Sequence, residues 1–267
     1  MLITGGSGFI GSAYIEKYGG ENLDITSSDL YGDIRSPHAV DETVKGQDGI
    51  INMAAISGVM DCYNDPVNAV ATNVQGAVNV LEAGRAHSIP VILASSGAVN
   101  SPTNPYAASK FAMETFAVAF AHSYGLDVSC LRFTNVYGPG SKDKTSAIAA
   151  FCKQALTTGK IIVKGTGEQT RDFVYIEDVV EAIKVVTDTP QQMKPPIINI
   201  CGGNQPSISE IAHIIRDLAG DCEIVYTEPR IGDVPSNVVG RDFHRLQGNT
   251  DIRDGIEKTF NYFKEVL

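Results

Sequence analysis

The first residues of the chain place a glycine-rich turn between an apolar run and a predicted helix. The run Met1–Ile3 precedes the segment Gly5–Gly11, which carries glycine at Gly5, Gly8 and Gly11. Glycine allows the positive φ of a tight turn and lets the backbone approach a pyrophosphate without a Cβ in the way. The phosphates then lie at the helix N-terminus, where N–H groups and the helix dipole attract negative charge. This order predicts the first part of a dinucleotide-binding βαβ unit.

A carboxylate follows the second predicted strand. The apolar-leaning run Leu23–Ser28 ends at Asp29, which lies 24 positions after Gly5 (29 − 5). A carboxylate at this place accepts hydrogen bonds from both hydroxyls of an adenosine ribose and repels a 2′-phosphate. No cation follows before Arg35. Asp29 therefore favours NAD over NADP, and its alternative role is to cap a turn.

Length and charge restrict the class of protein. A chain of 267 residues accommodates one large core with a smaller lobe, and its net charge is −10 with scattered Lys and Arg. Scattered cations do not form the basic surface that nucleic acid or an anionic membrane requires. The five cysteines form no C-x-x-C pair, and no apolar stretch reaches the roughly 18 residues of a membrane span. We therefore expect no metal site, no nucleic-acid or membrane partner, no signal peptide and a cytoplasmic location.

Predicted strands and helices alternate along the chain. Apolar runs of strand length lie at Gly49–Ala55, Val91–Ser95 and Val128–Phe133, with helical patterns between them. Alternation of this kind implies parallel pairing with right-handed crossovers. The expected fold is α/β, a Rossmann-type doubly wound parallel sheet with a smaller C-terminal α/β substrate lobe. The NAD-binding domain is expected at residues 1–137 plus about 172–200, and the substrate-binding lobe at about 138–171 and 201–267.

A phenol and an ammonium are spaced by one helical turn. Tyr106 and Lys110 stand at i and i+4 of a predicted helix, and Ser96 ends the strand before it. A tyrosine with a pKa near 10 acts as a base at neutral pH only if its phenolate is stabilised by about 3 pKa units, roughly 4 kcal/mol. Lys110 and a positively charged nicotinamide would supply this stabilisation, and Ser96 would reach the same substrate oxygen. The alternative interpretation is a surface pair without a role.

Together these motifs resemble the extended short-chain dehydrogenase/reductase family, in its nucleotide-sugar epimerase/dehydratase branch. The resemblance runs nearly end to end and includes UDP-glucose 4-epimerase-like enzymes. Further motifs that carry it are Gly32-Asp33-Ile34-Arg35, Asn73-Val74-x-Gly76, Ser95-Ser96-x-Ala98-Val99, Leu131-Arg132-x-x-Asn135-Val136-Tyr137-Gly138-Pro139 and Arg171-Asp172-Phe173-Val174.

The resemblance implies a role for each matching residue. Ser96, Tyr106 and Lys110 would be the catalytic set. The nucleotide diphosphate would be held by Asn135, Arg171 and Arg230, and two arginines suit phosphate because guanidinium groups bind its oxygens bidentately. NAD would be bound by Gly5, Gly8, Phe9, Ile10 and Gly11 at the pyrophosphate, Asp29 at the ribose, Asp33 and Ile34 at the adenine, and Ala54, Ala55, Asn73, Tyr106, Lys110 and Phe133 at the nicotinamide half.

The sequence departs from the family in two connections. Ten positions separate Ser96 from Tyr106 (106 − 96), where relatives carry a longer loop that helps to cover the sugar. The connection from Asp29 to Asp33 is also short, and Val99 is followed by Asn100 instead of the usual glycine. We expect cofactor binding to survive these changes, whereas the sugar cannot be named from them.

Three functions from different classes are compatible with this sequence. The first is an NAD-dependent epimerase of a nucleotide-diphosphate sugar, with C4 as the expected carbon. The second is an NAD(P)H-dependent nucleotide-sugar ketoreductase, and the third a cofactor-binding regulator without turnover, which the set of Ser96, Tyr106 and Lys110 disfavours. A 4,6-dehydratase is disfavoured too, because those relatives carry an Asp-Glu pair where this chain has Gly97-Ala98.

The apolar helices near 65–87 and 105–124 predict a homodimer.

Overall fold

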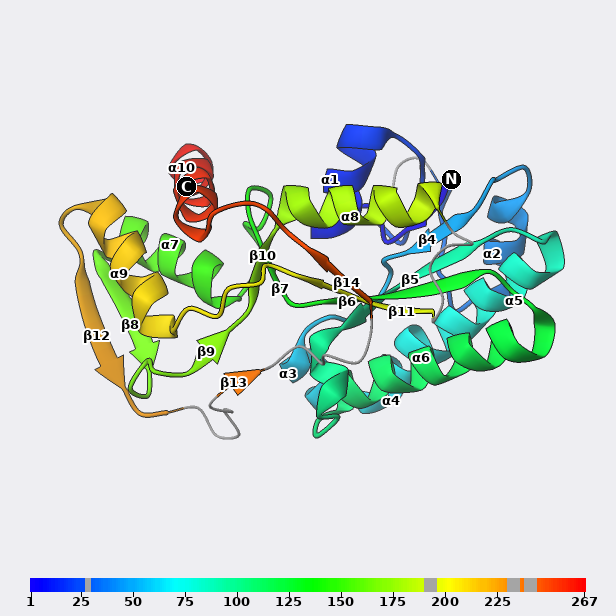
Figure 1. Cartoon of the computed structure of the whole chain (residues 1–267), viewed down its shortest axis with the longest axis horizontal. Helices are drawn as coiled ribbons and strands as arrows, with labels where there is room; N and C mark the ends of the chain where they lie inside the picture. Colours follow the sequence, from blue (N-terminus) through cyan, green and yellow to red (C-terminus); the bar gives the residue numbers. More distant parts are fainter. Residues whose placement is uncertain (27–29, 190–195, 230–235, 238–243) are drawn as a thin grey trace. The chain divides into compact units, whose positions relative to one another are not determined.

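The computed structural model describes residues 1–26, 30–189, 196–229, 236–237 and 244–267 (Figure 1). The chain divides into two compact units. The first consists of Met1–Phe133, Val180–Asn199 and Gly240–Leu246. The second consists of Thr134–Val179, Ile200–Val239 and Gln247–Leu267.

The first unit is organised around an eight-stranded sheet with the strand order β14-β11-β6-β5-β4-β1-β2-β3. The pairs from β3 to β6 are all parallel, and the order of these six strands is that of a doubly wound dinucleotide-binding sheet. The predicted α/β fold is therefore confirmed. The strands are β1 (Leu2–Thr4), β2 (Glu21–Asp24), β3 (Leu30–Tyr31), β4 (Ile50–Asn52), β5 (Val91–Ser96), β6 (Val128–Phe133), β11 (Ile197–Cys201) and β14 (His244–Gln247).

Helices cover both faces of this sheet, as a doubly wound fold requires. In Figure 1, α1 and α8 lie on one face, and α4, α5 and α6 lie on the other. The segment that reads as one helix from Asp65 contains a π-helical turn between α4 and α5. The helical segments are α1 (Phe9–Tyr18), α2 (Pro37–Val44), α3 (Val59–Asn64), α4 (Pro66–Val70), the π-helix Ala71–Gly76, α5 (Ala77–His87), the 3₁₀ turn Gly97–Asn100, α6 (Pro105–Tyr124) and α8 (Ile176–Asp188).

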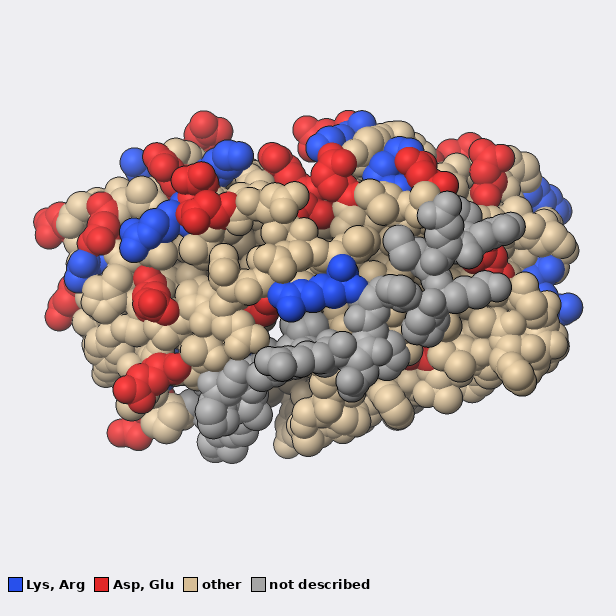
Figure 2. Space-filling view, in the orientation of Figure 1, with Lys and Arg blue, Asp and Glu red and all other residues tan. Residues whose placement is uncertain are grey.

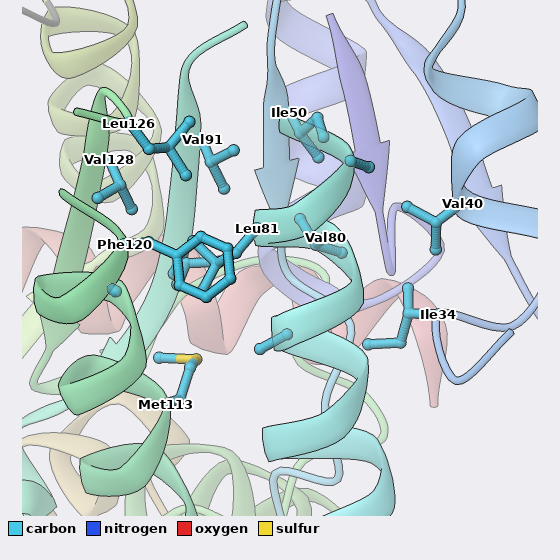
Figure 3. Packing of buried hydrophobic residues seen from close by; sticks show 14 of the residues in the cluster. Ile34, Val40, Ile50, Val80, Leu81, Val91, Met113, Phe120, Leu126 and Val128 are labelled. Atoms are coloured by element: carbon cyan, nitrogen blue, oxygen red, sulfur yellow. The ribbon is translucent and has the colours of Figure 1, made fainter. Parts of the chain in front are cut away.

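The core of the first unit lies between the sheet and the helices α2, α5 and α6. Figure 3 shows Leu81 of α5 and Phe120 of α6 reaching the strand residues Val91 and Val128. Each such side chain contributes about 1.5–3 kcal/mol when it is fully buried. This packing fixes α6 on the sheet and so determines where its first turn lies.

The second strand is shorter than its sequence predicts. The run Leu23–Ser28 was expected to be extended, but β2 ends at Asp24. The Asp24 carboxylate accepts hydrogen bonds from the backbone N–H of Thr26 at 2.9 Å and from its hydroxyl at 2.8 Å. This local turn competes with the strand and ends it.

Among its described residues, the second unit contains short parallel strand pairs and the helices α7 (Ala147–Thr158), α9 (Ile208–Ala219) and α10 (Ile252–Val266). The pairs join β7 (Asn135–Tyr137) with β10 (Phe173–Tyr175), β8 (Lys160–Lys164) with β12 (Glu223–Thr227), and β9 (Thr170–Arg171) with β13 (Ser236–Asn237). A capping box of Ser207 and Glu210 begins α9.

The described Lys and Arg residues form no separate basic patch on the face shown in Figure 2. Figure 2 shows Lys and Arg interspersed with Asp and Glu over the face in view. No helix among the described residues combines the length and apolar composition that crossing a membrane requires.

Candidate active site

Ser96 and Tyr106 meet at the carboxyl end of β5. Ser96 is the last residue of the strand, and its hydroxyl accepts a hydrogen bond of 3.2 Å from the backbone N–H of Ala98. Tyr106 lies in the first turn of α6, which Asn104 caps by accepting from the N–H of Ala107 at 2.9 Å. Ser96 lies close enough to the Tyr106 phenol to lower its pKa. The structure therefore brings the predicted phenol and hydroxyl close together.

The environment of Tyr106 acts on its acidity in both directions. Burial raises the pKa of Tyr106 above its ordinary value, the hydrogen bond from Ser96 lowers it, and the neighbouring Cys62 thiol raises it. A hydrogen bond donated to the phenolate stabilises the charged form. Ser96 thus favours the ionised phenol that general-base chemistry needs.

Lys110 lies one turn after Tyr106 and is buried. Its ammonium donates a hydrogen bond of 2.8 Å to the backbone carbonyl of Ala94 in β5. Burial lowers the pKa of Lys110 to about 8, so the ammonium remains charged at neutral pH. Burial, Ser96 and Cys62 are the influences on the pKa of Tyr106 among the described residues, and the effect of Lys110 on the phenol stays a prediction.

The glycine turn fits a dinucleotide pyrophosphate. A Cβ on Gly5, whose φ is +69°, would lie 2.5 Å from the backbone nitrogen of Ala54, and one on Gly11 would lie 2.6 Å from the carbonyl oxygen of Gly5. A Cβ on Gly8 would instead enter space where the Gly5 carbonyl oxygen, at 3.2 Å, is the only described atom within 4 Å. Among the described residues no side chain caps α1 at Gly8. The turn is closed on the protein side and open where phosphate would lie, with Phe9 and Ile10 in the first turn of α1.

A second aspartate, which the sequence interpretation missed, contacts this turn. Asp24 ends β2, and its carboxylate accepts a hydrogen bond of 3.1 Å from the backbone N–H of Ser7. It lies 19 positions after Gly5 (24 − 5), close to the roughly 20 that separate the glycine turn from a ribose-binding acid. Asp29 lies outside the described residues. The spacing was a usable signal for Asp24, but the longer apolar run concealed where the strand ends.

The residues predicted at the adenine are held by neighbours. Asp33 accepts hydrogen bonds from the Arg35 guanidinium at 2.8 and 3.0 Å, which holds the pKa of its carboxyl below the ordinary value. The Ile34 side chain is buried in the core, and its carbonyl accepts from Asn79 at 2.8 Å. The Asp33 carboxylate is thus bound by Arg35 and the Ile34 carbonyl by Asn79, and the roles of both residues at the adenine stay predictions.

Asn73 connects the segment after β4 to α6. Its side-chain oxygen accepts from the backbone N–H of Ile56 at 2.8 Å, and its nitrogen donates to the Ile56 carbonyl at 3.0 Å and to the Ser109 hydroxyl at 2.9 Å. Ser109 in turn donates to the carbonyl of Tyr106 at 2.8 Å. Both amide hydrogens of Asn73 are used inside the protein. Asn73 therefore fixes the half-buried segment of Ala54 and Ala55 relative to Tyr106.

The remaining predicted residues lie in three places. Phe133 ends β6 and is the cross-strand partner of Ser96. Asn135 and Arg171 belong to the second unit, on both sides of Asp172, whose backbone carbonyl accepts from the Asn135 side chain at 2.8 Å. Arg230 lies outside the described residues. The Asp172 carboxylate accepts from Thr134, Gly202 and Gly203 at 2.7, 2.8 and 3.0 Å.

Comparison with known proteins identifies the family of the chain. Residues 1–201 match the NAD dependent epimerase/dehydratase family. The chain belongs to this family. The family predicted from the motifs is confirmed, together with the NAD cofactor and an enzyme of the epimerase class.

Individual members of the family are similar over most or all of the chain. A UDP-glucuronate 4-epimerase of Thermodesulfobacterium geofontis is 31% identical over 242 residues, which are 81% of this chain and 72% of that protein. A UDP-glucose 4-epimerase of Mycolicibacterium smegmatis is 28% identical and covers 98% of both chains. The solved UDP-glucose 4-epimerase of Thermus thermophilus, in complex with NAD, superposes with a TM-score of 0.87 at 26% identity over 100% of this chain and 99% of that one.

Proposed function

We propose that the chain is an NAD-dependent 4-epimerase of a nucleotide-diphosphate sugar, acting through a transient 4-keto sugar. The observation that carries the proposal is that Ser96 at the end of β5 lies beside the Tyr106 phenol, one helical turn from the buried Lys110 ammonium. The relatives named as UDP-sugar 4-epimerases support the substrate class.

Tyr106 acts as the general base of this reaction. As phenolate it removes the proton of the sugar 4-hydroxyl, and Ser96 holds the same oxygen by a hydrogen bond. The Lys110 ammonium, fixed on the Ala94 carbonyl, contributes positive charge one turn from the phenol. Tyr106 returns the proton when the keto group is reduced on its other face.

The glycine turn and the acids near it would bind the cofactor. Bound NAD supplies hydride acceptance from C4 and hydride return to it. The open side of Gly8 and the N-terminus of α1 would hold the pyrophosphate, and Asp33 the adenine edge. Asp29 would bind the ribose, with Asp24 as a second candidate for this role. Asn73 keeps the chain segment of Ala54 and Ala55 in place beside the nicotinamide half.

We assign cofactor binding to the first unit and nucleotide-sugar binding to the second. Asn135 donates to the backbone carbonyl of Asp172, and Arg171 precedes Asp172 in the chain. An amide and a guanidinium are thus available near one residue, a pairing that suits a diphosphate. A nucleotide held at its diphosphate leaves the keto sugar free to rotate. The short connection from Ser96 to Tyr106 suits a sugar site with room for this rotation.

The test is turnover on a panel of nucleotide sugars. With UDP-glucose and UDP-glucuronate, the expected products are the C4 epimers, formed with catalytic amounts of NAD and without net absorbance change at 340 nm. Tyr106→Phe should lose most activity and still bind NAD. Stoichiometric consumption of NADH or NADPH on a keto sugar would establish the ketoreductase instead.

The chain is further proposed to form a two-fold dimer. The helices α3 and α4 pack beside α6, and together they expose Met60, Val67 and Phe111, of which Val67 is 78% exposed (Figure 1). Apolar surface of this extent on adjacent helices is what a symmetric helical interface covers. Light scattering should give twice the chain mass, and Val67→Lys should give the monomer. A wild-type monomer at micromolar concentration would refute the dimer.

The chain is also proposed to work in the cytoplasm. The five cysteines are free thiols, four of them buried, which suits a reducing compartment. Fractionation of the native host should recover the protein with cytoplasmic markers, and recovery with secreted proteins would contradict this location.

A further inference from the structure

A buried ion pair lies beneath the segment that carries Ser96. Glu114 of α6 and Arg132 of β6 are 2% and 5% exposed. Arg132 donates from Nε to one Glu114 oxygen at 2.8 Å and from Nη2 to the other at 2.6 Å. Two parallel bonds of this kind fix the relative orientation of both side chains. Helix α6 is thereby tied to the middle of the sheet.

The same pair contacts the chain on both sides of Ser96. The Ser95 hydroxyl donates to Glu114 at 2.6 Å, and Ser95 is the cross-strand partner of Arg132. Arg132 Nη1 donates to the side-chain oxygen of Asn100 at 3.2 Å. Ser95 precedes Ser96 directly, and Asn100 follows it by four positions (100 − 96). The turn with Ser96 is therefore held at both ends.

Tyr106 is connected to this pair through its helix. Glu114 lies eight positions after Tyr106 on α6 (114 − 106), about two helical turns. Since α6 is continuous from Pro105 to Tyr124, a shift of Glu114 moves Tyr106 as well. The Glu114 carboxylate therefore positions both Ser96 and Tyr106.

Stability alone gives no reason for such a pair. Taking two charges out of water costs several kcal/mol per ion, and apolar side chains of similar volume are often as stable or more stable. We propose that Glu114 and Arg132 are positioning residues, which hold the Ser96 hydroxyl in place beside the Tyr106 phenol. This role rests on the proposed function of that phenol as a base.

The experiment replaces the whole polar group by apolar side chains. Single substitutions would leave a buried charge without a partner, so the variant is Ser95→Ala/Glu114→Leu/Arg132→Met. We expect it to unfold in urea no earlier than the wild type. Its kcat should fall at least about tenfold with KM within about twofold, because small misplacements of reacting groups cost one to two orders of magnitude.

A titration of Tyr106 supplies a readout that needs no substrate. Ultraviolet titrations are measured with and without Tyr106→Phe, and the difference isolates this phenol from the other nine tyrosines. In the triple variant the segment of Ser96 is no longer fixed. The phenol then loses the influence of Ser96 that lowers its pKa, and it should titrate at higher pH. An unchanged titration overturns the proposal, whatever the activity. A shifted titration in a chain that epimerises nothing refutes the proposed function and leaves the positioning role standing.

Two further variants complete the design. The exposed pair of Glu82 and Arg85 on α5 has the same chemistry, and Glu82→Leu/Arg85→Met should change neither readout. Should the triple variant not fold, Arg132→Lys keeps the charge and loses the paired bonds, so the same upward shift is expected. A wild-type titration of folded Arg132→Lys would then overturn the proposal.

Discussion

The Lys110 ammonium donates a hydrogen bond of 2.8 Å to the backbone carbonyl of Ala94, which lies two residues before Ser96 on the same strand. This bond satisfies a buried charge and fixes the second turn of α6 on β5. Burial nevertheless lowers the pKa of Lys110 to about 8, from an ordinary value of 10.5. The protonated form is therefore less favourable in the folded chain than in the unfolded one.

This shift predicts a pH-dependent stability. Between about pH 8 and 10.5 the unfolded chain holds the Lys110 proton more tightly, so the contribution of this group to the free energy of unfolding rises with pH. Lys110→Met removes that contribution. Urea unfolding is measured from about pH 7 to 10. Above about pH 8, the free energy of unfolding of the wild type should rise relative to that of the variant. The contributions of the buried thiols and phenols are common to both proteins and cancel in this difference. A difference that is constant over this range would show that Lys110 has its ordinary pKa.

The acid at the end of β2 is expected to control the cofactor. Asp24→Ala removes the acceptor of the Ser7 N–H and the carboxylate next to the glycine turn, so NAD affinity should fall at least about tenfold, as for loss of a charged hydrogen bond. Calorimetry with NAD and NADP measures it. The parallel variant is Asp29→Ala, which the sequence predicts will relax the preference for NAD. Wild-type NAD affinity in Asp24→Ala with a large loss in Asp29→Ala would exclude Asp24 and leave Asp29 as the ribose-binding acid.

The Asn73 amide is expected to support the site without contacting substrate. Asn73→Asp keeps the shape and turns two donors into acceptors that face the Ile56 carbonyl and the Ser109 hydroxyl. The free energy of unfolding should fall by about 1–3 kcal/mol. Ser109→Ala should cost less, because it removes two neutral hydrogen bonds and places no buried charge against an acceptor. Urea unfolding of both variants tests this order. Equal stability of Asn73→Asp and wild type would mean that the amide network is dispensable.

The catalytic pair could be predicted from local spacing in the sequence. Short-range patterns place Ser96 at the end of a strand and Tyr106 in the first turn of the next helix. The parallel sheet follows from the alternation of predicted strands and helices along the chain. The end of β2 depends instead on a side-chain turn between Asp24 and Thr26 and on a contact with Ser7, neither of which periodicity reports. The network of Glu114 and Arg132 joins two strands and a helix, so only the folded chain reveals it.

The most direct measurement of the central claim follows the hydrogen at C4 of the sugar. UDP-glucose carrying deuterium at C4 is incubated with the chain and catalytic NAD in unlabelled water, and the product is examined by proton NMR. The account predicts UDP-galactose that retains deuterium at C4, because the hydride that leaves returns to the same carbon. Loss of the label to solvent, or a keto sugar accumulating together with NADH, would contradict it.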